Sequence, residues 1–240
     1  MAWMRARQPE NLPDGCDEIR FMRGLTESHE GLKTWNDAIE AFLKSDSEWL
    51  WSTHNDVDFH PQTLRRLFSW NKPLISALIF MRQSPVVPHI WKAYADDTSG
   101  RMANRIQNTR EWFFNHLDYV RFGPFIMDPR PDDALVEVSF TSTSCTLIHR
   151  SVLEKMTPPW FTMDAYGSGG EDRRFHEGAK AAGFPGYVDR SCIAGHLVGD
   201  VATSSLDFMM WSQVSEFKNT GEREDDASII EMENVPETLK

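Results

Sequence analysis

The sequence contains little cysteine. Cys16, Cys145 and Cys192 are the three thiols in 240 residues, and no two of them form a CxxC pair. Zinc knuckles and dithiol redox sites need cysteines at that short spacing, so neither is expected here. Three widely spaced cysteines are typical of free thiols in a reducing compartment.

Long apolar runs are also missing. The first seven residues lack the apolar stretch of a signal peptide. No window approaches the roughly 18 uninterrupted apolar residues of a membrane helix. We therefore expect a soluble, cytoplasmic protein without a transmembrane segment.

Basic residues are in the minority, with 25 lysines and arginines against 36 aspartates and glutamates, which gives a formal net charge of −11. Binding to a phosphate backbone depends on basic clusters, and no run of five basic residues occurs, so a nucleic-acid partner is not expected. Neither a GxxxxGKS/T loop nor a GxGxxG motif is present, which argues against the nucleotide-binding classes that use them.

The sequence does contain enough apolar material for a core, because 40% of its residues are hydrophobic and these include 15 Phe and 9 Trp. This composition excludes a disordered acidic polymer, and the length favours one α/β domain. We place that domain at residues 19–220, after an irregular segment at 1–18. Residues 221–240 hold seven acidic and two basic side chains and are expected to form a flexible acidic tail.

Hydrophobic periodicity predicts the elements of the domain. Apolar residues at helical spacing predict a helix from Leu32 to Lys44. Further helices are expected after Pro61, near 104–117, from Ser151 and over 171–182. Strands are expected at 19–22, 49–53, 72–81, 135–140, 145–148 and 187–188. Because strands and helices alternate along the chain, the pattern predicts a mostly parallel central sheet with helices on its faces.

A polar cluster, His54-Asn55-Asp56-Val57-Asp58, follows the first long strand. Ligands of open α/β sheets bind beyond the carboxyl ends of strands. Two carboxylates two residues apart suit a hard divalent cation, which in turn neutralises a diphosphate. The same residues are also typical of a turn that caps the next helix.

Two later groups are candidates for chemistry. Gly169-Gly170-Glu171-Asp172 opens a helix, where acidic residues are favoured by the helix dipole alone, or where Asp172 could act as a general base. His196, between Gly195 and Leu197, follows a short predicted strand. By itself such a histidine is typical of a hydrogen-bonded structural residue.

Taken in order, these groups resemble the glycosyltransferases of the GT-A fold, especially family 2. The resemblance covers about residues 32–200, and three stretches carry it: 48–67 (EWLWSTHNDVDFHPQTLRRL), 143–161 (TSCTLIHRSVLEKMTPPWF) and 170–196 (GEDRRFHEGAKAAGFPGYVDRSCIAGH). It implies a GT-A-like α/β fold with a mostly parallel central sheet flanked by helices. No counterpart of the family's first strand, which holds the nucleotide base, precedes Leu12.

The resemblance also implies a metal site for Mn²⁺ or Mg²⁺. If the literal Asp-x-Asp is the family's metal motif, Asp56 and Asp58 bind the ion. If Pro61 sets the register, His54-Asn55-Asp56 is the motif, with His54 in place of its first acid. His196 matches a late histidine that joins the cation in metal-dependent members, and nitrogen ligands favour manganese.

The remaining site residues follow from the same resemblance. Asn36, Asn55 and Asp56 are expected to contact the donor nucleotide. Asp172, with Glu171, matches the acidic pair that acts as the base or binds the acceptor.

The function implied is metal-dependent transfer of a sugar from a nucleoside-diphosphate sugar to a hydroxyl of a glycan, lipid-linked sugar or protein. The alternative is a non-catalytic sugar or nucleotide-sugar binding module derived from that fold. A glycoside hydrolase with two carboxylates is a weaker third hypothesis, because it needs no metal motif. Four aromatic residues are candidates for a sugar-stacking wall or for the core: Trp91, Trp112, Phe113 and Phe122.

Overall fold

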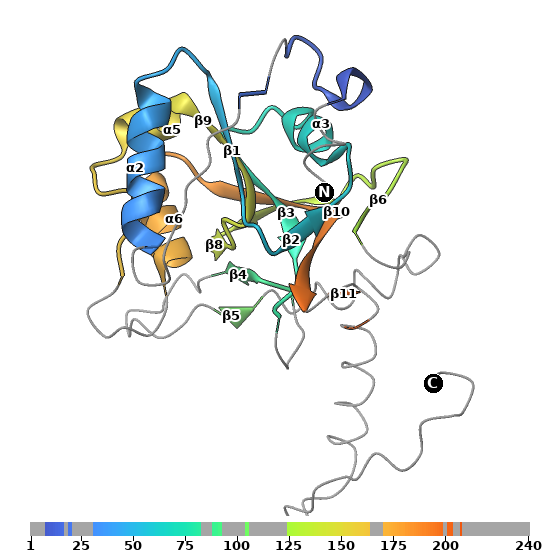
Figure 1. The fold of residues 1–240 in the computed structure, drawn as a ribbon. Coiled ribbons are helices and arrows are strands. Elements are labelled where there is room, and N and C mark those ends of the chain that lie inside the picture. The colour runs from blue at the N-terminus through green and yellow to red at the C-terminus, as the bar shows by residue number, and fades with distance from the viewer. Residues whose placement is uncertain are drawn as a thin grey trace, which may run out of the picture.

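A computed structural model of the chain describes residues 8–16, 19–20, 31–82, 88–92, 104–105, 124–163, 170–198, 201–203 and 207. Its helices are η1 (Pro9–Asn11), α2 (Gly31–Leu43), α3 (Thr63–Phe68), α5 (Arg150–Lys155) and α6 (Glu171–Ala181). The first strands are β1 (Trp49–Thr53), β2 (Val57–Phe59), β3 (Leu74–Ile79), β4 (Ile90–Lys92), β5 (Asn104–Arg105) and β6 (Phe125–Ile126). The later ones are β7 (Leu135–Val138), β8 (Phe140–Thr141), β9 (Cys145–His149), β10 (Gly186–Val198) and β11 (Val201–Ala202). Figure 1 shows their arrangement.

The main sheet has eight strands, and its central path runs β1-β9-β3-β10-β11. Among the strand pairs that the described residues form in this sheet, β3 with β10 is the parallel one. The strand β9 lies between β1 and β3 and is antiparallel to both. Likewise β2, β6, β7 and β11 all pair antiparallel with β10. The predicted GT-A-like fold with a mostly parallel central sheet flanked by helices is therefore wrong, since the sheet is mixed and dominated by antiparallel pairs.

The physical reason for this error is that burial does not reveal strand direction. All six residues of β3 are buried, which is the pattern of a strand covered on both faces. The sequence pattern predicts a parallel arrangement for such a run, because a helix separates it from β1. The two strands do run in the same direction, but β9 from later in the chain pairs between them.

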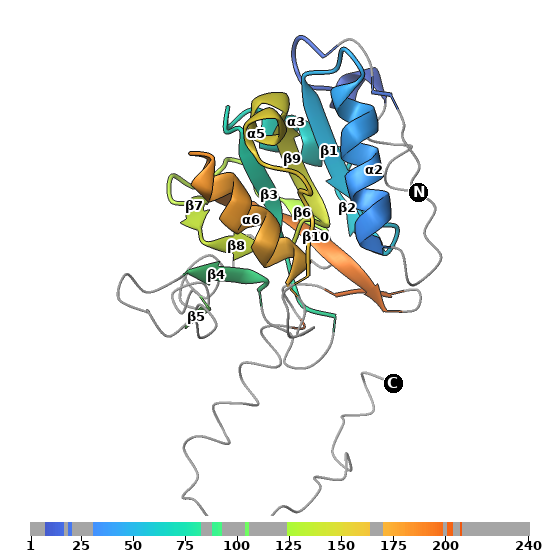
Figure 2. The ribbon, with the colours of Figure 1, turned by 90° about the vertical axis from the view of Figure 1, so that its left-hand side faces the viewer.

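Helices cover both faces of the central strands unequally. The helices α2, α5 and α6 lie on one face, and α3 lies on the other (Figures 1 and 2). Alternate residues of β3 follow this division: Leu74 packs with Phe42 and Phe175 on the first face, whereas Ile75 packs with Leu67 on the second. Between β3 and β9, the side chains of Ser76 and Thr146 share a buried hydrogen bond of 2.7 Å.

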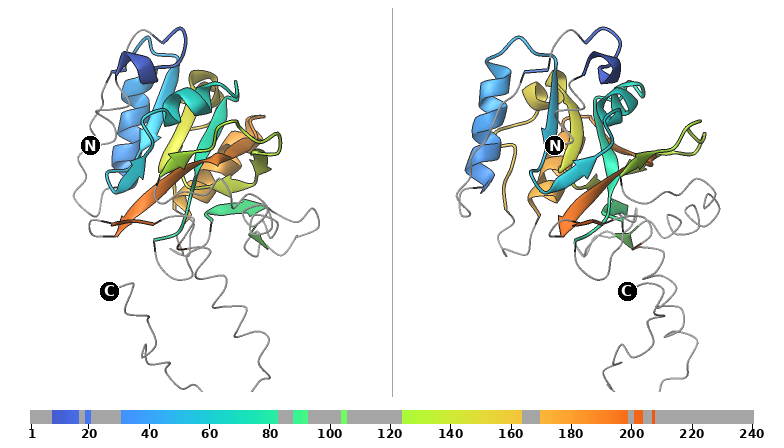
Figure 3. Two further views of the ribbon diagram at one scale, coloured as in Figure 1. Left: turned by 90° about the vertical axis from the view of Figure 1, so that its right-hand side faces the viewer. Right: turned by 45° about the vertical axis from the view of Figure 1, so that its right-hand side comes forward.

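Several sequence predictions match these elements and others do not. The helix predicted from Leu32 corresponds to α2. The strand predicted at 187–188 is the start of the 13-residue β10, which crosses the sheet in Figure 3. Where a helix was predicted to begin, Asn104 and Arg105 form a strand. The rest of that helix, Trp112, Phe113, Phe122 and the acidic tail lie outside the described residues. Within the described part of the chain, every helix is too short or too polar to span a bilayer.

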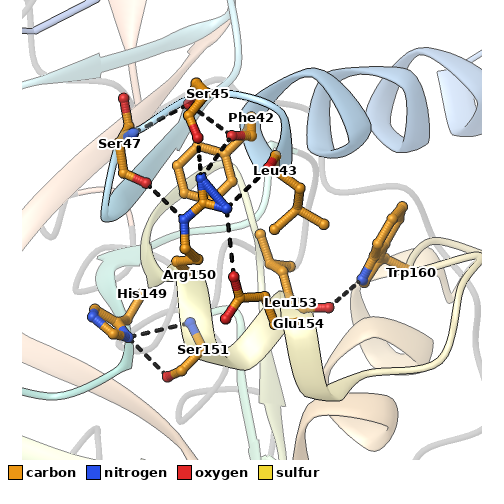
Figure 4. Close-up of polar contacts among 10 residues, drawn as sticks. All are labelled: Phe42, Leu43, Ser45, Ser47, His149, Arg150, Ser151, Leu153, Glu154 and Trp160. Atoms are coloured by element: carbon orange, nitrogen blue, oxygen red, sulfur yellow. Dashed lines mark hydrogen bonds and ion pairs between the residues drawn. The ribbon is translucent and has the colours of Figure 1, made fainter.

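Arg150, the first residue of α5, binds the carboxyl end of α2 (Figure 4). Its guanidinium donates to the carbonyls of Ser47 and Leu43 at 3.0 Å each, and also to that of Ser45. The last turn of α2 has no basic residue of its own. Arg150 therefore satisfies carbonyls at this helix end and supplies the positive charge that the helix dipole favours there.

We expect Arg150→Ala to lower the free energy of unfolding by about 2 kcal/mol or more, because several backbone acceptors lose a charged donor. Urea denaturation monitored by circular dichroism measures this loss. Arg174→Ala is the control, since Arg174 is exposed and its ion pair with Glu177 lies on one helix. Equal losses in the two variants would contradict the role assigned to Arg150.

Candidate functional site

Several of the polar residues singled out from the sequence lie close together at one edge of the main sheet, where His54 interacts electrostatically with Asp172, Glu171 and His196. This edge is at the carboxyl ends of β3 and β10, which lie low in Figure 1. The strands β1, β3 and β10 all point their carboxyl ends toward this edge, and β9 begins there. His54 follows β1, Arg82 comes three residues after β3, and His196 lies near the end of β10. Segments far apart in the sequence thus deliver side chains to one place.

His54 is the most enclosed of these groups. Its ring lies 5.2 Å from that of Trp35, between centroids, and its Nδ1 is 3.1 Å from Ser144 Oγ. Burial lowers the pKa of His54, and the charges of Asp172 and Glu171 oppose that shift. Its Nε2 is buried and has no hydrogen-bond partner within the described residues. A neutral imidazole with an unused ring nitrogen is the form that binds a metal or accepts a proton.

Asp56 lies two residues further on and forms an ion pair with Arg82 through Oδ2. Its other oxygen, Oδ1, is buried and lacks a hydrogen-bond partner among the residues that the structure describes. The main chain of Asp56 is fixed separately, because its carbonyl accepts a 2.8 Å hydrogen bond from the N–H of Leu197. The Asp56 carboxylate therefore presents one engaged oxygen and one unused oxygen.

His196 is held in a defined tautomer. Its Nδ1 lies 2.8 Å from the carbonyl oxygen of Phe80, and since a carbonyl only accepts, Nδ1 carries the proton. The lone pair is then on Nε2, the arrangement found in metal-binding histidines. Burial lowers the pKa of His196, and this favours the neutral ring.

Asp172 enters the site from the first turn of α6. Its Oδ1 accepts from the N–H and the hydroxyl of Thr143, at 3.0 and 2.5 Å. Glu171 is used differently, because its Oε2 accepts from the N–H of Gly170 at 3.2 Å and closes the start of the helix. Of the two acids, Asp172 is the one fixed against the sheet edge.

Within the described residues, the two asparagines predicted to contact the donor, Asn36 and Asn55, make no hydrogen bond to the histidines or carboxylates of this edge. The amide of Asn36 donates to the carbonyl of Phe161 at 2.9 Å and accepts from its N–H at 3.1 Å, so it joins α2 to the loop after α5. Asn55 is exposed in the turn before β2. Their contact with a donor nucleotide stays a prediction.

Asp58 points to the face of the sheet opposite to that of His196. In the pairing of β2 with β10, Asp58 stands opposite Gly195, and His196 stands opposite Val57. Directly paired residues share a face of the sheet, and neighbours along a strand alternate. Asp58 and His196 therefore point to opposite faces, whereas Asp56 precedes the strand.

The described residues contain no group of three or more His, Cys, Asp and Glu side chains arranged to hold a metal ion. These residues therefore do not form a metal site in which the protein supplies three or more of the ligands. Divalent ions that act on nucleotides usually need only one or two protein ligands, because phosphate oxygens and waters complete the shell. Asp56 and His54 each present one buried atom without a hydrogen-bond partner among the described residues, an oxygen and a nitrogen, and both are ligand types that such an ion accepts.

A buried histidine beneath the site, His176 on α6, makes stability depend on pH. Burial lowers its pKa from the ordinary value of 6.5, against the opposing effect of its hydrogen bond to the Asp172 carbonyl. The unfolded chain then binds a proton more readily than the folded one, so stability is complete above about pH 6.5 and falls as the pH drops below it.

We therefore expect His176→Gln to reduce the stability difference between about pH 7.5 and pH 5.5, measured as free energy of unfolding in urea. His54 and His196 shift in the same direction and remain in the variant, so the comparison isolates His176. An unchanged difference would show that another group causes the acid sensitivity.

Sequence reasoning missed Arg82 and Ser144. Arg82 comes directly after the apolar stretch at 72–81, and Ser144 comes directly before the strand that begins at Cys145. The rule that ligands bind beyond the carboxyl ends of strands would have selected Arg82. Ser144 could not be selected that way, because β9 was not known to be antiparallel and to begin at this edge.

No protein-family model matches the sequence, and no curated protein matches it. Ten chains of solved structures match. One is the crystal structure of A197 from STIV, with 18% sequence identity, a TM-score of 0.48, and coverage of 75% of this chain and 74% of that one.

Proposed function

We propose that this protein transfers a sugar from a nucleoside-diphosphate sugar to an acceptor hydroxyl. The observation that supports this most is the convergence of three separate motifs on one sheet edge. The pKa of His54 responds to the charges of Asp172, Glu171 and His196, which come from sequence segments more than one hundred residues away. The motif order that resembles family 2 glycosyltransferases thus corresponds to a cluster in space.

The donor diphosphate and a divalent cation, Mn²⁺ or Mg²⁺, would share this edge. Asp56 and an imidazole, His54 or His196, would hold the cation. Bound there, the cation would neutralise charge on the diphosphate as it leaves. We favour His54-Asn55-Asp56 as the motif, because Asp58 faces away from His196.

Asp172 is the proposed general base. Both donors on Thr143 bind the same oxygen, Oδ1, and this holds that oxygen against the sheet edge. The other oxygen, Oδ2, would accept the proton of the acceptor hydroxyl while that hydroxyl attacks the sugar carbon. The acceptor hydroxyl would belong to a glycan, a lipid-linked sugar or a protein.

Release of nucleoside diphosphate tests the proposal. Purified protein is incubated with Mn²⁺ and each of a panel of uridine- and guanosine-diphosphate sugars, with and without simple sugar acceptors. We expect one donor to be turned over, faster with an acceptor, and chelation of the metal to stop the reaction. Donor binding without any product would favour the non-catalytic binding module instead.

A further inference from the structure

The ion pair between Asp56 and Arg82 points to a coupling between the cation and the diphosphate. We propose that Arg82 is a diphosphate-binding residue that neutralises Asp56 until cation and diphosphate bind together. This inference rests on the proposed function, because it concerns the same edge of the sheet.

The first step of the argument concerns the cation alone. Arg82 is bound to Oδ2 of Asp56, so its positive charge lies beside the oxygen Oδ1 that a cation would use. Two positive charges on one carboxylate repel each other. A divalent ion arriving alone must therefore either share Asp56 with the positive charge of Arg82 or displace the guanidinium and leave it without a partner, and in both cases its affinity is low.

The second step concerns the diphosphate alone. Three carboxylates of the described residues lie at this edge. Those of Asp172 and Glu171 act electrostatically on His54, and that of Asp56 pairs with Arg82. Among the described residues at this edge, the positive charge that opposes them is the guanidinium of Arg82. A free diphosphate therefore meets a negative surface, and Arg82 is already engaged with Asp56.

Binding of both ligands removes both difficulties. The cation takes the place of Arg82 at Asp56, and the guanidinium turns to the phosphate oxygens, for which its planar pair of donors is suited. Arg82 can turn without unpacking the core, since its side chain is 49% exposed. By linkage, each ligand then raises the affinity for the other by the same factor.

The test measures two affinities in Arg82→Gln, with no turnover involved. Mn²⁺ binding without phosphate is followed by electron paramagnetic resonance. Binding of inorganic pyrophosphate at a fixed saturating Mn²⁺ concentration is followed by calorimetry. We expect Mn²⁺ alone to bind about tenfold more tightly than in wild type, and pyrophosphate with Mn²⁺ to bind at least tenfold more weakly. Arg82→Lys should lie between.

Arg65→Gln is the matched control, because Arg65 is 48% exposed and pairs with Asp14 on another part of the molecule. Both of its affinities should equal those of wild type. Weaker binding of both ligands in Arg82→Gln would show a structural role and overturn the proposal, as would no change in either. Opposite shifts in a protein that turns over no donor would support the coupling and remove the transferase proposal. Donor turnover by the wild type without those shifts in Arg82→Gln would support the transferase proposal and overturn the coupling.

Discussion

Replacing Asp56 by alanine is expected to lower donor turnover by at least about 100-fold, the scale seen when a group that stabilises transition-state charge is removed. The side chain provides an unused buried carboxylate oxygen at the sheet edge and is the partner of Arg82. Its side chain is 30% exposed, and its main-chain bond to Leu197 does not depend on the carboxylate. The fold should therefore survive, as circular dichroism and the urea midpoint would show.

Asp58→Ala is the matched control for Asp56→Ala. It removes the same chemical group two residues away, from the face of the strand opposite to His196. We expect turnover within about threefold of wild type, since substitutions away from a site usually have small effects. A severe loss in Asp58→Ala with near-normal Asp56→Ala would assign the metal to the literal Asp-x-Asp motif and reject the register proposed here.

The second large effect is expected for Asp172→Asn. Asparagine keeps an oxygen that can accept from the N–H and hydroxyl of Thr143, so the contact between α6 and the sheet edge is preserved. It replaces the second carboxylate oxygen by an amide that cannot take a proton. The transfer rate should fall by roughly 10² to 10⁴, with donor affinity nearly unchanged.

Glu171→Gln separates the two acids of this motif. Glu171 accepts from the N–H of Gly170, and glutamine can replace it in that contact, so a small effect on rate is expected. If Glu171→Gln lost as much activity as Asp172→Asn, the base would be Glu171 or the pair. A loss of donor affinity in Asp172→Asn comparable to the loss of rate would identify Asp172 as a structural residue of the helix start.

Local elements were predictable from the sequence because each follows from its own residues. The spacing of Trp35, Ile39 and Phe42 predicts α2, and its buried residues are Ile39 and Phe42. The pairing of strands was not predictable in this way. Nothing in residues 49–53 indicates that Trp51 pairs with Leu147, because the composition of a strand does not give the direction of its neighbour.

The site was predictable only in part, for a related reason. His54 and Asp56 follow a strand directly, so their place at the sheet edge follows from the chain itself. The contacts that define their chemistry come from elsewhere: Arg82 for Asp56, Ser144 for His54, and Phe80 for His196. These depend on the tertiary arrangement, which local patterns do not encode.

The position of β9 also governs how the chain can fold during synthesis. The strands β1 and β3 leave the ribosome early, but neither has a neighbour until β9, and β3 waits longer for β10. Such high contact order slows folding and leaves apolar strands exposed to aggregation. A fragment that ends before Cys145 should therefore not form the sheet, whereas expression at low temperature or with chaperones should raise the yield of the whole chain.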